Sequence, residues 1–137
     1  MLDHTDLQIL NLLKENSRMQ YRDIGDLVHL TGQAVSNRVA RMEKLGVIKG
    51  YSILLDEKLL GKSLLAYITV FMKTTEHGLF QSFLQEQEFV TEACRISGEG
   101  CYMLRVETQS AEELDRLLDS LLPYGNYRIN LSIKKIK

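Results

Sequence analysis

Cysteine, histidine and long apolar runs are all scarce in this sequence. Its 137 residues include two cysteines and three histidines, and these do not cluster. We therefore expect free thiols in a reducing compartment, with no disulfide framework, no metal and no cofactor. The longest apolar run, SLLAYITVFM, is the length of a strand and too short to cross a bilayer. We expect no membrane segment, no secretory signal and a cytoplasmic location.

Net charge is also small, but its distribution along the chain is uneven. The formal net charge is −1. Residues 31–51 nevertheless carry Arg38, Arg41, Lys44 and Lys49 against a single acid, Glu43. A local basic segment in a nearly neutral chain indicates a surface that meets a polyanion more clearly than the total charge does.

Apolar residues recur at helical spacing in three successive segments. The first helix is predicted over residues 3–15, with Asp3 as its N-cap. The second is predicted over residues 20–28, where Gly25 indicates close packing against a neighbour. The third is predicted over residues 32–45, between the cap Thr31 and Gly46. The residues expected to face the core are Leu7, Leu10, Leu13, Ile24, Leu27, Val28, Val35, Val39 and Met42, with Leu45 at the edge of the last stripe.

The segment VIKGYSILLD, which follows the third helix, is rich in apolar and β-branched residues. It predicts a strand or a β-hairpin wing, interrupted by Gly50. Three helices with a tight turn before the last, followed by such a wing, make a winged helix-turn-helix domain, which we assign to residues 1–60. In that kind of domain the third helix enters the major groove of DNA.

The polar face of the third helix suits base recognition. Glutamine and asparagine can bind adenine through two hydrogen bonds, and arginine can bind guanine in the same way. Hydroxyl groups near the helix start and basic side chains along its flanks can hold phosphates. The alternative is an ordinary solvated face, because any exposed helix is polar. The candidate DNA-binding residues are Thr31, Gln33, Ser36, Asn37, Arg38, Arg41, Lys44 and Lys49.

The two arginines of this helix are expected to differ in role. A helical wheel places Arg41 beside the polar face, together with Ser36. Arg38 lies at the edge of the apolar stripe, so we expect its stem to be half-buried. Its guanidinium is expected to pair with an acid such as Asp26 or Glu43, with a phosphate contact as a second role.

Residues 61–137 follow a different pattern, which predicts the order β-α-β-β-α-β. Strands are expected at 64–73, in FVTEACRIS, in CYMLRVET and at 127–133, with helices at 76–87 and in SAEELDRLLDSLLPYG, where Ser110 and Glu113 predict a capping box. This α+β order is the ferredoxin-like arrangement. Two helices on one face leave the other face of the sheet uncovered, and a dimer that stacks two sheets would cover it.

The stretch LTGQAVSNRVARMEKLGVIKGYSILLD closely resembles the Lrp/AsnC (feast/famine) family of transcription regulators. The opening LDHTDLQILNLLKENSR and the hairpin ISGEGCYMLRV are similar to the same family, so the resemblance covers nearly the whole chain. It implies sequence-specific binding to double-stranded DNA by a homodimer that assembles into a tetramer or octamer. It also implies that residues 61–137 are a RAM/AsnC-type regulatory domain for dimerisation and for sensing an amino-acid effector.

The resemblance places the effector site at the hairpin between the second and third strands, where the family pattern is approximately Gly-Asp-aromatic-Asp-Tyr. In this chain Gly100 replaces the aromatic residue and Cys101 replaces the second aspartate, and Ile129 stands where the family often has threonine. A thiol is a poor acceptor for an ammonium group. We expect a pocket that is empty, altered or specific for another molecule, or a hairpin shaped for subunit contact. The candidate effector-binding residues are Gly98, Glu99, Gly100, Cys101 and Tyr102.

Two other functions are left open by the sequence. A sirohaem or haem decarboxylase-like enzyme would have the same fold, but it needs histidines lining a large cavity, whereas those of this chain are dispersed. An assembly module would bury the uncovered sheet without binding DNA. Because no Ser/His/Asp triad, P-loop or Gly-x-Gly-x-x-Gly fingerprint is present, we do not expect an enzyme. A redox switch is not expected, because a hairpin centred near Glu99 does not place Cys94 opposite Cys101.

Overall fold

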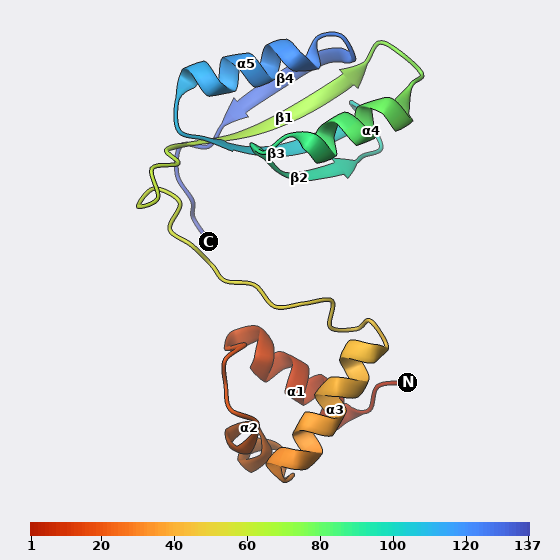
Figure 1. Cartoon of the computed structure of the whole chain (residues 1–137), viewed down its shortest axis with the longest axis vertical. Coiled ribbons are helices and arrows are strands. Elements are labelled where there is room, and N and C mark those ends of the chain that lie inside the picture. Colours follow the sequence, from red (N-terminus) through yellow and green to blue (C-terminus); the bar gives the residue numbers. More distant parts are fainter. The chain divides into compact units, whose positions relative to one another are not determined.

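The computed structural model describes every residue from Met1 to Lys137 and divides into two compact units. The first unit is Met1–Leu54 and the second is Leu55–Lys137. Each has a hydrophobic core of its own. Figure 1 shows helices alone in the first unit, and helices packed on a sheet in the second. None of the helices combines the length and the apolar composition needed to span a bilayer.

The first unit contains α1 (His4–Glu15), α2 (Tyr21–Val28) and α3 (Gly32–Lys44). Asp3 caps α1 as predicted, because its carboxylate accepts a hydrogen bond from the Asp6 amide at 2.8 Å. The Thr31 hydroxyl caps α3 by accepting from the Ala34 amide at 3.1 Å. At the other end of α3, Gly46 has a φ of 73° and begins the chain reversal that ends the helix. Both predicted boundaries of the third helix are therefore confirmed.

The core of the first unit differs from the predicted one in α1 and α2. Leu7 and Leu27 were predicted to face inward, but their side chains are 50% and 58% exposed. In α1 the predicted Leu13 is buried, but the other inward positions are occupied by Asp6 and Ile9. The prediction was wrong because it followed the leucines and excluded a carboxylate from the core. In α3 the predicted buried stripe of Val35, Val39 and Met42 is confirmed, but Leu45, expected at its edge, is 58% exposed because it lies at the C-cap, past the last turn of the helix.

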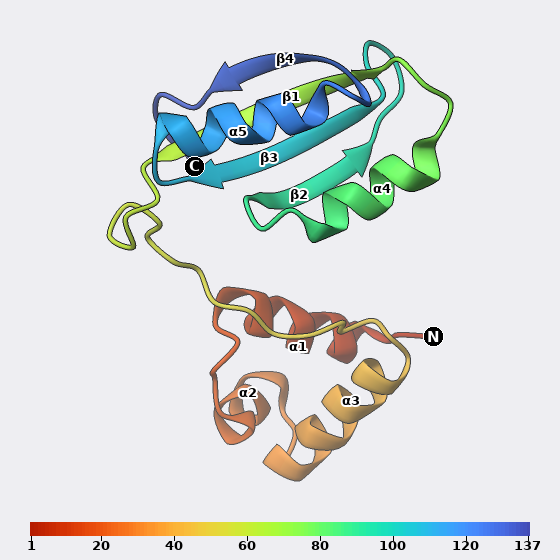
Figure 2. The same cartoon turned by 45° about the horizontal axis from the view of Figure 1, so that its top comes forward.

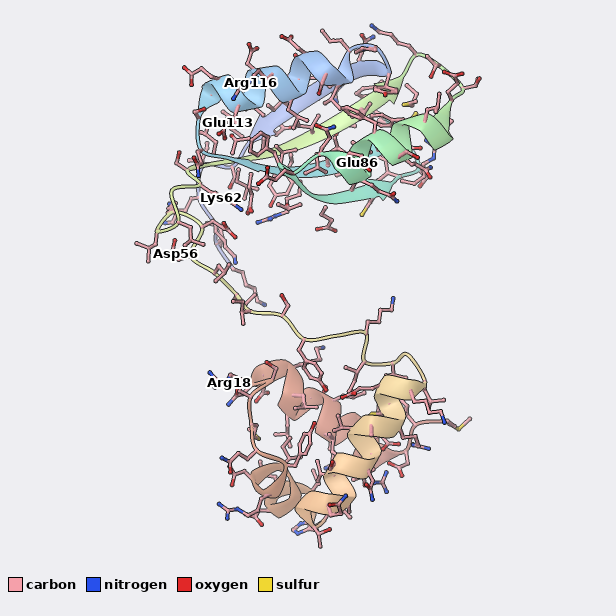
Figure 3. The ribbon with its side chains drawn as sticks, viewed as in Figure 1. Arg18, Asp56, Lys62, Glu86, Glu113 and Arg116 are labelled. Carbon is pink, nitrogen blue, oxygen red and sulfur yellow. The ribbon has the colours of Figure 1, made fainter.

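The predicted wing is absent, and this part of the fold prediction was wrong. Residues 47–63 contain no strand, and residues 49–55 make no backbone hydrogen bond to any other part of the chain. A strand needs a neighbour to satisfy its backbone groups, and no segment of this chain pairs with it. Residues 56–62, which follow this segment, make short-range contacts. Asp56 accepts from the Lys58 amide, and the Lys62 ammonium lies 3.5 Å from a Glu57 carboxylate oxygen (Figure 3).

The second unit has the predicted βαββαβ order. Its elements are β1 (Leu64–Met72), α4 (His77–Glu86), β2 (Val90–Arg95), β3 (Tyr102–Thr108), α5 (Ala111–Leu121) and β4 (Gly125–Leu131). The strands form one antiparallel sheet in the order β2-β3-β1-β4, so β1 and β3 are central. Both helices lie on one face of this sheet (Figure 2). The arrangement is ferredoxin-like, as expected.

Alternation along β1 sorts its residues between the two faces of the sheet. Ala66, Ile68 and Val70 are buried against α4 and α5. Tyr67 lies on the opposite face with Met103, and the two side chains are 42% and 39% exposed. No helix of the second unit covers that second face (Figure 2). The last strand ends at Leu131, because Ser132 makes the final backbone bond to β1.

The capping box predicted for α5 forms only in part. The Ser110 hydroxyl accepts from the Glu113 amide at 3.2 Å, as expected. The Glu113 carboxylate, labelled in Figure 3, accepts from the Gln109 amide at 2.8 Å instead of from the Ser110 amide. The return bond is therefore displaced by one residue, but both bonds still satisfy amides at the start of the helix.

Candidate nucleic-acid interface

The exposed face of α3 carries a pair of amide side chains one turn apart. Gln33 and Asn37 are both exposed, and Gln33 Nε2 donates to Asn37 Oδ1 at 3.0 Å. This bond leaves Gln33 Oε1 as an acceptor and Asn37 Nδ2 as a donor, neither with a partner in the chain. Ser36 is half-buried beside them. Each amide carries both an acceptor oxygen and an NH₂ donor, the combination that matches the N6 donor and N7 acceptor of adenine in the major groove.

The N-terminal end of α3 has no acidic residue in its first turn. No nearby negative charge therefore compensates the positive end of the α3 helix dipole. The hydroxyl of Thr31 is engaged as the cap, but Thr31 itself is exposed. At the other end, Lys44 and Lys49 are both exposed and form no ion pair within the chain. These lysines are available to an external anion.

Arg38 is engaged by two carboxylates at the start of α1. Its Nη1 lies 2.7 Å from Asp3 Oδ2 and 2.9 Å from Asp6 Oδ1. The predicted acidic partners, Asp26 and Glu43, were therefore wrong. The error arose because the partners were sought close by in sequence, whereas the fold brings α1 against α3. The prediction of a half-buried stem is confirmed, since the Arg38 side chain is 30% exposed.

Arg41 shares the same buried carboxylate. Its Nη2 lies 2.6 Å from Asp6 Oδ2, while Asp6 itself is completely buried. Burial alone would raise the pKa of Asp6, but hydrogen bonds from the Asp3 amide and the Arg38 guanidinium outweigh it and lower the pKa of this carboxyl. The Arg38 bond also lowers the pKa of Asp3, whose hydrogen bonds in turn raise the pKa of Arg38. Asp3, Asp6 and Arg38 are therefore charged at neutral pH.

The segment after α3 is tied back to that helix by backbone bonds from Val47 and Ile48 to Met42 O and by one side-chain bond. The Tyr51 hydroxyl donates to Glu43 Oε1 at 2.8 Å. Burial, followed by the negative charge and hydrogen bond of Glu43, raises the pKa of Tyr51 to about 12. Glu43, the single acid of the basic segment, thus accepts a hydrogen bond from within the chain. Lys49 lies in the same short loop, between α3 and Tyr51.

The candidate effector residues lie in a tight turn between β2 and β3. Gly98 and Gly100 have φ angles of 87° and 90°, a conformation that favours glycine. A β-carbon on residue 100 would overlap the Thr69 side chain, so the structure explains why no aromatic residue fits here without a shift. The Cys101 amide donates to Val70 O at 2.7 Å. Glu99 is the exposed tip of the turn.

Tyr102 is a core residue rather than an open contact. Its side chain is only 3% exposed, and its hydroxyl lies 2.9 Å from His77 Nδ1 and 3.0 Å from Gln81 Nε2. The Arg95 guanidinium stacks over the Tyr102 ring at 5.0 Å from its centroid. Since Arg95 can only donate, its 3.2 Å contact with His77 Nδ1 makes that nitrogen an acceptor. These three neighbours of Tyr102 were missed by the sequence analysis.

A groove of about 480 Å³ lies beside this cluster, between α4 and β2. Tyr102 is the only candidate effector residue in its wall, which also includes Gln81, Glu92 and Arg95. The register of the hairpin, which pairs Arg95 with Tyr102, was a signal that could have found Arg95. Cys94 pairs with Met103, and both cysteines are free thiols. The expectation that Cys94 does not lie opposite Cys101 is confirmed.

Comparison with known proteins places both units of the chain. Residues 2–43 match the AsnC-type helix-turn-helix domain, and residues 65–137 match the Lrp/AsnC ligand binding domain. The chain is 46% identical to the HTH-type transcriptional regulator LrpB of Bacillus subtilis over 136 residues, which cover 99% of this chain and 91% of that protein. It is 35% identical to LrpA of the same organism, with 98% and 100% covered.

Solved structures agree with this assignment. LrpC of Bacillus subtilis superposes with a TM-score of 0.93 at 29% identity, over 100% of this chain and 98% of that one. Two more distant structures share the fold. One is a Neisseria meningitidis transcriptional regulator in complex with L-Met, with a TM-score of 0.92, 24% identity and 100% and 93% covered. The other is Escherichia coli AsnC, with a TM-score of 0.89 and 21% identity, over 100% of this chain and 95% of that one. The chain therefore belongs to the Lrp/AsnC family.

Proposed function

We propose that this protein is a transcriptional regulator that binds specific sequences in double-stranded DNA through α3. The observation that carries the proposal is the Gln33–Asn37 pair, two amide side chains that lie one turn apart on an exposed helix face and keep donor and acceptor capacity free. A helix of this kind fits the major groove, where such a pair can read adenine. Relatives that match nearly the whole chain are named HTH-type transcriptional regulators, which supports the same role.

The residues around this pair are proposed to position the helix. Ser36 and the exposed start of α3 at Thr31 approach the DNA backbone, where an uncompensated helix terminus favours a phosphate. Lys44 and Lys49 supply unpaired positive charge for further phosphates. These contacts orient the protein but carry little sequence information, so specificity rests on Gln33 and Asn37.

The regulator is proposed to act as a homodimer that stacks the uncovered faces of two sheets. That face carries Tyr67 and Met103, both exposed in the single chain. A second copy would remove these apolar groups from water. Assembly of dimers into tetramers or octamers is a further step that the family resemblance supports.

Modulation by a small molecule is proposed for the second unit. Its match to the Lrp/AsnC ligand binding domain and the L-Met complex of a structural neighbour support an amino acid as the class of effector. The candidate residues are those of the Gly98–Tyr102 turn. Glu99 is the carboxylate there that could accept from an ammonium group, but it is exposed at the tip. We therefore propose that an effector needs a second subunit to enclose it.

The two alternatives are less well supported. An enzyme of the decarboxylase type is not favoured, because the relatives are named as transcriptional regulators. An assembly module without DNA affinity is not favoured either, because residues 2–43 match the AsnC-type helix-turn-helix domain. A stable oligomer that binds no DNA would favour the assembly module.

The proposal is tested by fluorescence anisotropy with two labelled duplexes. One is the duplex that the wild-type protein enriches from a random library, and the other has the same length and an unselected sequence. We expect Asn37→Ala to weaken binding to the enriched duplex by about 5- to 150-fold, the value of one bidentate base contact. Asn11→Ala, at an exposed position of α1, is the matched control and should change neither affinity. Wild-type affinity in Asn37→Ala would refute this site.

A further inference from the structure

Four charged side chains join the start of α1 to the middle of α3. Asp3 and Asp6 supply the carboxylates, and Arg38 and Arg41 supply the guanidinium groups, with N–O distances from 2.6 to 2.9 Å. Asp6 is the centre of this cluster, because each of its oxygens accepts from a different arginine. Asp6 Oδ2 also accepts from the Asp3 amide at 3.0 Å. The cluster therefore unites the capping box of α1 with two turns of α3.

The cluster changes how much positive charge α3 offers to DNA. Of the four basic residues between positions 31 and 51, Arg38 and Arg41 are compensated by Asp3 and Asp6. If Arg41 turned toward a phosphate, it would leave part of a completely buried carboxylate without its cation. Stranding a buried charge is costly. Only Lys44 and Lys49 therefore lie free.

The same cluster fixes the rotation of α3 about its axis. Arg38 and Arg41 are three residues apart, so they lie on one side of the helix, and both are held by Asp6. Asp6 cannot move away, because it is fully buried and bonded to the N-cap backbone of its own helix. Rotation of α3 would break these bonds. Gln33 and Asn37 are therefore presented at one angle relative to α1.

We propose that Asp6 and Asp3 are positioning residues that set DNA selectivity by withholding Arg38 and Arg41 from phosphates and by fixing the angle of the Gln33–Asn37 pair. The inference rests on the proposed DNA binding and deepens it. It reassigns Arg38 and Arg41, which the sequence placed among the DNA contacts, to an internal role. Selectivity gains because phosphate contacts strengthen binding to every sequence equally.

The first test replaces Asp3 by asparagine. Asn caps a helix as well as Asp does, so the variant keeps the N-cap while removing one of the two carboxylates that hold Arg38. The readout is the slope of log affinity against log salt for the unselected duplex. We expect the slope to steepen by up to about 0.9, the contribution of one additional phosphate contact. The preference for the enriched duplex should fall at the same time.

Asp26→Asn is the matched control for Asp3→Asn. Asp26 is an exposed acid of α2 that makes no ion pair in the chain. Like Asp3→Asn, this control removes one negative charge from residues 1–54, but it releases no arginine. We expect its salt slope to equal that of the wild type. Equal slopes in Asp3→Asn and Asp26→Asn would overturn the inference.

A second pair of variants tests Arg41 directly. Arg41→Gln and Lys44→Gln each remove one positive charge from α3. If Arg41 is held by Asp6, Arg41→Gln leaves the salt slope unchanged but reduces the preference for the enriched duplex, because α3 is released. Lys44→Gln should instead make the slope shallower by about 0.9 and leave the preference unchanged. A slope in Arg41→Gln as shallow as in Lys44→Gln would overturn the inference.

Failure of this inference can be told apart from failure of the proposed function. A wild-type protein that shows no preference for any duplex would refute sequence-specific binding and the inference that rests on it. A wild-type protein with a clear preference, combined with an Asp3→Asn variant that behaves like Asp26→Asn, would overturn the inference alone. Circular dichroism of each variant confirms that the helices are retained before the slopes are compared.

Discussion

Gly25 of α2 lies directly against the carbonyl group of Leu30, a residue of the turn that connects α2 to α3. The Leu30 amide donates to Gly25 O at 2.9 Å, and a β-carbon on residue 25 would overlap Leu30 O. The backbone oxygen cannot move aside without disturbing the turn between the two helices. The close packing predicted from this glycine is thus a property of the helix-turn-helix unit itself.

Gly25→Ala is therefore expected to destabilise the protein by about 3 kcal/mol, the upper range for overpacking a tight site. The measurement is urea unfolding followed by circular dichroism. Gly78→Ala is the matched control, because a β-carbon at position 78 of α4 meets no atom within 4 Å. There we expect a gain of up to about 1 kcal/mol from helix propensity. Equal effects of the two substitutions would contradict the packing argument.

His29 is the one residue other than glycine with a positive φ, at 59°. It is the C-cap of α2, where left-handed backbone costs a residue with a β-carbon roughly 1 kcal/mol relative to glycine. We expect His29→Gly to raise the free energy of unfolding by about that amount. Asn16→Gly, at the C-cap of α1 with a φ of −147°, should give no gain. A loss of stability in His29→Gly would show that the imidazole makes a contribution larger than the strain.

The stability of the first unit should depend on pH through Asp3 and Asp6. Both pKa values are lowered by folding, so the unfolded chain binds more protons than the folded chain at acid pH. Their contribution is fully present above about pH 5 and is lost as the pH falls through the folded pKa values. We expect Asp6→Asn to cost about 2 kcal/mol at pH 7, since hydrogen bonds to two charged groups are lost. The difference between wild type and variant should shrink between pH 5 and pH 3.

The measurement is urea unfolding of both proteins at several pH values, and Asp26→Asn serves as its control. Other carboxylates also titrate in this range, so only the difference between wild type and variant is compared. A difference that stayed constant down to pH 3 would contradict a lowered pKa for Asp6, because a carboxylate that stays charged only in the folded protein must lose its stabilising contribution as the unfolded chain takes up protons.

A charge placed on the uncovered sheet face should weaken the dimer. Met103→Lys keeps a long unbranched side chain and places a cation at an exposed position of β3. We expect it to shift the protein toward monomer in sedimentation velocity, because the ammonium loses its hydration in a stacked interface. Gln85→Lys, on the exposed side of α4, adds the same charge away from the sheet. If Gln85→Lys forms monomers and Met103→Lys does not, the dimer interface lies on the face of the sheet that α4 and α5 cover.

The sequence predicted best those features whose causes are local. The caps Asp3 and Thr31, the end of α3 at Gly46 and the buried stripe of that helix depend on neighbouring residues, and all are confirmed. The order of elements in the second unit follows from alternation and turn residues for the same reason.

The errors concern residues whose partners are distant in sequence. Asp6 is buried because Arg38 and Arg41 lie 32 and 35 residues further along the chain, so helical periodicity in α1 could not place it in the core. The wing failed for a related reason. The run VIKGYSILLD has the composition of a strand, but Ile53 and Leu54 are exposed and pair with nothing in the chain. Composition describes a strand's preference, whereas a strand forms only beside a partner.

The central claim is that α3 reads DNA sequence, and selection from a random duplex library tests it most directly. After several rounds with the wild-type protein, we predict one enriched motif that contains A·T pairs at fixed positions, as an amide pair requires. A parallel selection with a Gln33→Ala/Asn37→Ala variant should lose those positions. Enrichment of no motif by the wild type, or of the same motif by the variant, would contradict the account.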